Sequence, residues 1–121
     1  MSGNHYTRAM IDEATFRRES DLALERLKQA LIAAEDTSGG FEFEDNNGVM
    51  NILFEDGSSK FVVTPNTPVR QIWISALTTS FKLDWDEAAG VFVLAKTGET
   101  LMPLVERLLR EHLGDASITL I

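Results

Sequence analysis

The chain has 121 residues, no cysteine and a formal net charge of −8. This length fits one domain that folds around one core without metal or disulfide. The absence of cysteine excludes disulfides, thiolate metal sites and thiol nucleophiles. The acidic charge disfavours nucleic acid and anionic membranes as partners, because both select a cationic face.

The sequence contains no apolar run of about 18 residues, the length of a membrane span, and residues 1–10 lack the apolar core of a signal peptide. We therefore expect a cytoplasmic protein that does not contact the membrane. Residues 1–121 are predicted to form a single domain, with residues 1–11 as a mobile N-terminal segment.

Residues 12–36 have the pattern of an amphipathic helix. Apolar residues recur at a spacing of 3.6 on one stripe, and charged or amide side chains occupy the opposite stripe, with Ile32 as the misfit. The sequence TSGG at residues 37–40 is expected to end the helix, since glycine readily adopts the left-handed conformation found there. The predicted inner stripe comprises Phe16, Ala23, Leu27, Ala30, Leu31 and Ala34.

Short strands are predicted for most of residues 41–94. Turn sequences such as DNNG and EDGS separate segments of alternating or continuous apolar residues. Pro65 is expected to end the third strand. Regularly spaced short strands with tight turns predict an antiparallel meander. The six segments are 41–44, 49–54, 61–64, 69–75, 81–85 and 91–94.

A second amphipathic helix is predicted from Leu101 to Gly114, with Thr100 as its N-cap. Its apolar stripe includes His112, and the C-terminal tail DASITLI is expected to lie back on the fold. Two helices and one sheet predict an α+β fold, a two-layer α/β sandwich with both helices on one face of about six strands. The other sheet face then meets water or a partner.

Trp73 is expected on that uncovered face. In QIWIS (residues 71–75) the alternation places Ile72 and Ile74 on one face and Trp73 on the other. An exposed tryptophan is typical of protein interfaces, and neighbouring donors could surround it, namely Arg70, Gln71, Ser75 and Lys82. The alternative is a one-residue bulge after Pro68 that turns Trp73 inward.

Carboxylates cluster where the first helix meets the first strand. Glu35 and Asp36 end the helix, and Glu42, Glu44 and Asp45 lie on or after the strand. Such oxygens suit hard divalent or trivalent cations. The alternative is a solvated edge that discourages strand-to-strand aggregation. The sequence contains no nucleophile elbow, phosphate-binding glycine loop or His-rich metal spacing, so we expect a protein that is not an enzyme.

Three segments carry a resemblance to a known family. TPVRQIWIS (67–75), then FKLDW (81–85), then TGET (97–100) at the start of the last helix resemble the frataxin family, and within it the bacterial CyaY-type members. The likeness extends from about Glu19 to Gly114. The pattern P-x-x-Q-I-W, here from Pro68 to Trp73, is its most specific mark.

The resemblance implies an iron-binding protein of iron–sulfur cluster assembly. Family members bind Fe²⁺ or Fe³⁺ weakly through surface carboxylates, dock on the cysteine desulfurase and the scaffold protein, and regulate sulfur transfer or deliver iron. We expect a monomer in the absence of iron. The implied metal ligands are Asp21, Glu25, Glu35, Asp36, Glu42, Glu44 and Asp45. The implied partner surface comprises Trp73, Gln71, Arg70, Ser75, Thr64 and Asn66.

Two departures from the family pattern affect these expectations. The end of the first helix carries Lys28, Gln29 and two alanines where the family usually has acids, which implies a lower iron capacity. Thr64 and Asn66 stand where asparagine and glutamine are typical. The alternative functions are a ferroxidase that stores iron, which the thinned acidic run disfavours, and an acidic interaction adaptor without a metal role.

Overall fold

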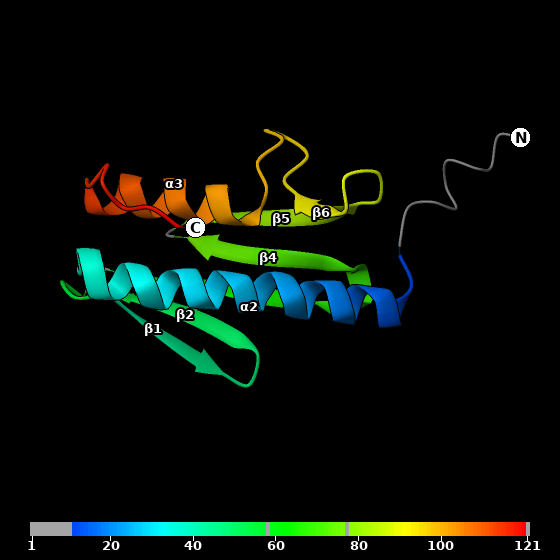
Figure 1. The fold of residues 1–121 in the computed structure, drawn as a ribbon, viewed down its shortest axis with the longest axis horizontal. Helices are drawn as coiled ribbons and strands as arrows, with labels where there is room; N and C mark the ends of the chain where they lie inside the picture. The colour runs from blue at the N-terminus through cyan, green and yellow to red at the C-terminus, as the bar shows by residue number, and fades with distance from the viewer. Residues whose placement is uncertain (1–10, 58, 77, 121) are drawn as a thin grey trace, which may run out of the picture.

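The computed structural model describes residues 11–57, 59–76 and 78–120, so the segment predicted to be mobile lies outside it except for Ile11. The elements follow one another as helix, six strands and helix (Figure 1). Neither helix in the described ranges is long and apolar enough to cross a membrane. The elements are α2 (Glu13–Ser38), β1 (Phe41–Asn46), β2 (Val49–Phe54), β3 (Lys60–Asn66), the 3₁₀ turn η1 (Thr67–Val69), β4 (Gln71–Ala76), β5 (Thr79–Asp86), β6 (Val91–Val93) and α3 (Leu101–Leu113).

The six strands form one sheet in the order β1-β2-β3-β4-β5-β6, and every neighbouring pair is antiparallel. This confirms the predicted meander. Both helices lie on the same side of the sheet, in front of the strands in Figure 1. The predicted two-layer sandwich is therefore confirmed, and the sheet face away from the helices has no covering element among the described residues.

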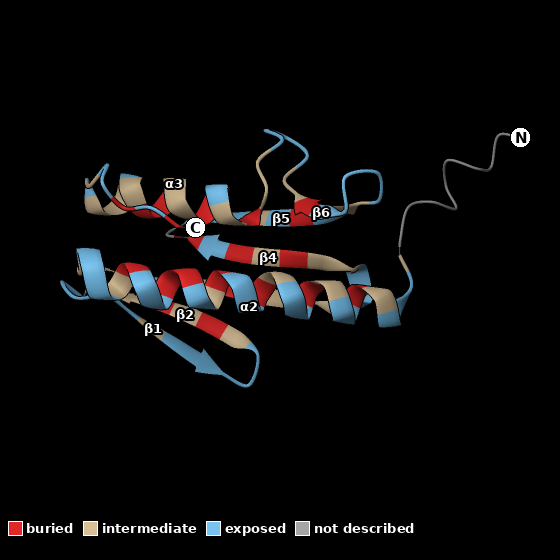
Figure 2. Cartoon of the chain, in the orientation of Figure 1, coloured by how far each residue is buried: buried red, intermediate tan, exposed pale blue. Residues whose placement is uncertain are grey.

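Helix α2 begins where its sequence supplies a cap. The Asp12 carboxylate accepts a hydrogen bond from the Thr15 main-chain N–H at 2.8 Å, which satisfies one of the free donors of the first turn and lowers the pKa of Asp12. The buried stripe differs in part from the predicted one, because Leu24 and Ser20 are buried whereas Ala23 is only half-buried (Figure 2). The helix continues to Ser38, two residues beyond the expected end, and Gly39 then stops it with φ of 73°.

The connection between β3 and β4 was predicted wrongly in two details. Pro65 does not end β3, which continues to Asn66, and β4 begins at Gln71 rather than at Val69. The 3₁₀ turn, with Pro68 in its first positions, occupies the intervening residues. Arg70 then reverses the chain in a left-handed conformation, with φ of 55°, a conformation that residues other than glycine seldom adopt.

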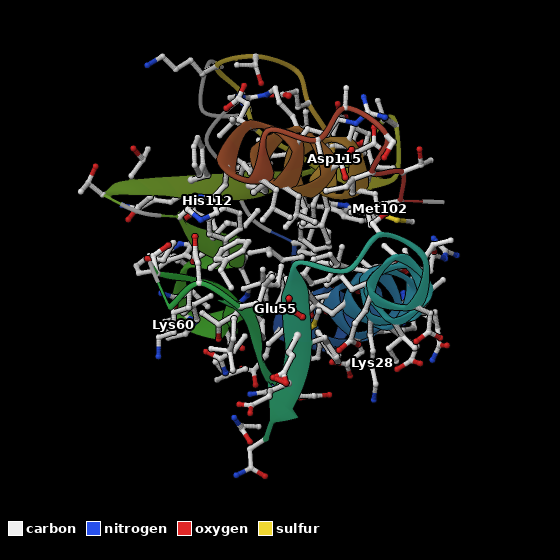
Figure 3. All side chains as sticks on the ribbon, turned by 90° about the vertical axis from the view of Figure 1, so that its left-hand side faces the viewer. Lys28, Glu55, Lys60, Met102, His112 and Asp115 are labelled. Atoms are coloured by element: carbon white, nitrogen blue, oxygen red, sulfur yellow. The ribbon has the colours of Figure 1, made fainter. Side chains whose placement is uncertain are left out.

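Helix α3 closes the second half of the core. Its buried residues include Leu104 and Leu109. The ring of His112, labelled in Figure 3, lies 4.1 Å from the Phe54 ring between centroids, with the two planes tilted by 46°. Thr100 is the N-cap, as predicted, although its side chain makes no capping hydrogen bond. The C-terminal tail lies back on the fold, as predicted, since Ile118 is buried.

The loop before α3 is fastened by an ion pair. Arg107 donates two hydrogen bonds to the Glu99 carboxylate, at 2.6 and 2.9 Å. These bonds lower the pKa of Glu99 and raise that of Arg107. This pair lies on the helix side of the molecule and positions the segment that leads into α3.

Candidate functional site

Strand β4 presents Trp73 on the uncovered sheet face. Ile72 and Ile74 are 0% and 1% exposed and point into the core, whereas Trp73 lies on the opposite face. The register of β4 with β3 and β5 is continuous through this position, so the bulge that would have turned Trp73 inward is absent from the described β4. The predicted direction of the side chain is confirmed. Trp73 is half-buried rather than fully exposed.

The partial burial of Trp73 has a visible cause in its neighbours. Its indole N–H donates to the Gln71 side-chain oxygen at 2.8 Å, and the Gln71 amide nitrogen donates to Asp84 at 2.9 Å. The Lys82 ammonium lies 4.9 Å from the centre of the indole ring, within cation–π range. We call these four residues, Gln71, Trp73, Lys82 and Asp84, the tryptophan array. Two hydrogen bonds and the cation–π contact link its four members.

Register explains how the array is assembled. Trp73 lies opposite Lys82, and Gln71 lies opposite Asp84, on the neighbouring strand β5. Asp84 was not among the predicted site residues. The signal that would have found it is the alternation within FKLDW, which puts residues 82 and 84 on the same face as each other once Leu83 is assigned to the core.

The other predicted partner residues divide into two groups. Thr64 lies opposite Trp73 on β3, Asn66 lies opposite Gln71, and exposed Ser75 follows on β4, so all three share the face of the array. Arg70 is directed elsewhere. Its guanidinium donates to the main-chain oxygens of Thr67 and Ile11, which ties the turn before β4 to the residue that precedes α2.

The predicted metal ligands are distributed over two sides of the edge strand β1. Glu42 and Glu44 pair opposite Leu53 and Asn51, on the outer sheet face. Asp45 lies on the side of the helices, where its carboxylate is 3.6 Å from the Lys28 ammonium of α2. Period-two alternation places Asp45 on the opposite side from Glu44, although the two residues are consecutive in sequence.

On the helix side, three acids line a hollow of about 210 Å³ between α2 and the sheet, where Met50 of β2 and Pro65 of β3 also line it. Lys28 lies in the same hollow and neutralises part of their charge; its side chain projects from α2 in Figure 3. Among the described residues no group of three or more acidic or histidine side chains is close enough to hold a metal ion. The acids that line the hollow are Asp21, Glu25 and Asp45.

Glu35 and Asp36 belong to the last turns of α2, near its junction with β1. Glu35 and Asp36 are consecutive on the helix, so their side chains do not face each other, whereas Glu42 and Glu44 share the outer face of β1. The chemistry that this arrangement allows is weak binding of cations to single carboxylates or carboxylate pairs with retained water, and attraction of basic groups.

Comparison with known proteins agrees with this architecture. A family model described as a frataxin-like domain matches residues 9–115. The iron-sulfur cluster assembly protein CyaY of Azotobacter vinelandii is 32% identical over 81 residues, which cover 67% of this chain and 73% of that protein. The protein of the same name from Pseudomonas putida strain W619 is 34% identical over 89 residues, covering 73% and 80%.

A solved structure of frataxin from Psychromonas ingrahamii is similar, with a TM-score of 0.73 and coverage of 91% of this chain and 96% of that one. Its 14% sequence identity makes this a likeness of fold. The family match spans both helices and the whole sheet. This chain therefore belongs to the frataxin-like domain family.

Proposed function

We propose that the protein acts in iron–sulfur cluster assembly by docking on the cysteine desulfurase and its scaffold protein. The observation that carries this proposal is the tryptophan array on a sheet face that no described element covers. The names of the curated relatives, iron-sulfur cluster assembly proteins, support the same pathway.

The tryptophan array has the properties of a docking anchor. A rigid aromatic side chain loses little conformational freedom on binding, because Gln71 and Lys82 already hold Trp73 in place. The indole supplies apolar contact area, and Lys82 and Asp84 place opposite charges beside it. An aromatic centre surrounded by polar groups is typical of the residues that dominate binding free energy.

The acids around β1 have a second role in this proposal. They attract basic groups of the desulfurase over several ångströms and bind iron weakly as cargo or regulator. Bound iron cancels negative charge, so iron occupancy changes how strongly a basic partner is attracted. Iron can therefore regulate partner binding without a preformed metal site.

The proposal is tested with a purified bacterial cysteine desulfurase and scaffold protein. We expect the chain to co-elute with the desulfurase at low salt and to change the rate at which clusters form on the scaffold. Absence of co-elution together with an unchanged rate would contradict the proposal. Co-elution without any effect of Fe²⁺ on the affinity for the desulfurase would indicate an interaction adaptor without a metal role.

Replacing Lys28 with glutamine should strengthen cation binding. The substitution releases Asp45 from its ion pair and removes one positive charge from the hollow. We expect the affinity for Fe²⁺, measured anaerobically by NMR shifts of the Glu25 and Asp45 amides, to rise roughly threefold to tenfold.

The matched control is Lys96→Gln, which changes the net charge equally at an exposed position in the loop before α3. That variant should leave the affinity within about twofold of the unmodified chain. Equal effects of the two substitutions would show that Lys28 does not oppose a local cation site.

A further inference from the structure

The two edges of the sheet are built differently. At one edge the strand β6 has only three residues. The segment before α3 lies along it, since Val93 forms a bridge with Thr100 and the Leu94 N–H donates to the main-chain oxygen of Glu99 at 2.8 Å. At the other edge β1 has six residues and pairs, within the described chain, with β2 alone. Its last three residues are exposed, and this end of β1 extends beyond α2 in Figures 1 and 3.

The free main-chain groups of β1 can be assigned. Gly40 immediately precedes β1 and Glu55 immediately follows β2. The Glu55 N–H donates to the main-chain oxygen of Gly40 at 3.2 Å. Main-chain bonding alternates along an antiparallel pair, so every second residue from Gly40 onward bonds to β2. The N–H and C=O groups of Phe43 and Asp45 therefore point away from the sheet.

Side-chain charge determines which strand can pair with this edge. Glu42 and Glu44 stand two residues apart on the outer face, and the chain carries a net charge of −8. A second copy of β1 would bring these carboxylates against their own equivalents, and like charges across a strand pair are destabilising. A strand with basic side chains at alternate positions would instead meet them with opposite charge.

We infer that the edge of β1 binds an extended basic segment of a partner protein as a seventh strand. The inference rests on the proposed function only in assuming a basic partner, and it specifies that partner's conformation and sequence pattern. Residues opposite Glu42 and Glu44 must project onto the outer face and carry lysine or arginine. The residue between them meets half-buried Phe43 and is apolar, so the segment alternates basic and apolar residues.

The test uses short synthetic peptides of alternating lysine and valine, added to the full-length protein at low salt. Amide hydrogen exchange should slow at Phe43 and Asp45, whose N–H groups become bonded, and should change little at Glu42 and Glu44. Two further peptides carry N-methyl groups, one on the valines and the other on the lysines. Alternate residues of a strand direct their N–H groups to opposite sides, so only one of the two peptides has its methyl groups on the side that bonds to β1. That peptide should bind about tenfold more weakly than the parent. The other should have an affinity within about twofold of the parent.

The variant Glu42→Gln/Glu44→Gln should weaken binding of the parent peptide, whereas the charge-matched Glu13→Gln/Glu87→Gln should retain it. Equal affinities for the two methylated peptides, or unchanged exchange at Phe43 and Asp45, would overturn the inference and leave docking through the tryptophan array intact. Conversely, if the chain does not bind the desulfurase but the peptide slows exchange at Phe43 and Asp45, the proposed function is overturned and the inference about β1 stands.

Discussion

Replacing Trp73 with alanine should lower the affinity of the chain for the cysteine desulfurase about thirtyfold or more, and the protein should remain folded. The binding loss is expected because the substitution removes the indole and leaves Gln71 and Lys82 without the ring that positions them. Tryptophans at the centre of an interface often contribute this much on truncation. Calorimetric titration of the desulfurase with each variant measures the effect.

The fold tolerates this change because Trp73 lies outside the core. The side chains on either side of it, Ile72 and Ile74, provide the packing of β4 against the helices. The control is Leu22→Ala, which removes an exposed apolar side chain from α2 on the opposite side of the molecule. Desulfurase affinity within about twofold of the unmodified chain for Trp73→Ala would show that the tryptophan is not an anchor.

The direction of Trp73 was predictable because strand alternation is a local property. Two isoleucines at period two determine which face is buried, whatever the strand pairs with. The tryptophan array was not predictable in full, because it depends on register. Asp84 and Lys82 join it only because β5 pairs with β4 so that these residues lie opposite Gln71 and Trp73.

Arg70 illustrates a different limit. Its position beside Gln71 in sequence indicated a donor for a partner, yet its left-handed backbone separates it from β4 and directs its guanidinium to Thr67 and Ile11. A positive φ at a residue other than glycine leaves no pattern in composition or periodicity. The end of β3 was missed for a related reason, since Pro65 remains within the strand.

The acids around β1 show how topology divides a cluster that looks continuous in sequence. Alternation already placed Glu42 and Glu44 together, opposite Phe41 and Phe43, but it could not show how they lie relative to the acids of α2. It also could not predict that Lys28 reaches Asp45 across the hollow. Long-range contacts of this kind depend on how the helix crosses the sheet, which local sequence does not encode.

The alternation of β4 also predicts that neighbouring residues have opposite phenotypes. Ile74→Ala should lower the free energy of unfolding by about 2–5 kcal/mol, since it leaves a cavity under a residue that is 1% exposed. Urea denaturation followed by circular dichroism measures this loss. Ser75→Ala, at the exposed position that follows, should change stability by less than about 0.5 kcal/mol.

The two strand faces can then be separated in one experiment. At a temperature where Ile74→Ala remains folded, its desulfurase affinity should match that of the unmodified chain, because the substitution leaves the tryptophan array on the other face in place. Trp73→Ala should show the reverse combination, near-native stability with weak binding. A stability loss below about 1 kcal/mol for Ile74→Ala would mean that the core beneath β4 repacks, and the outer face could then not be treated as a rigid docking surface.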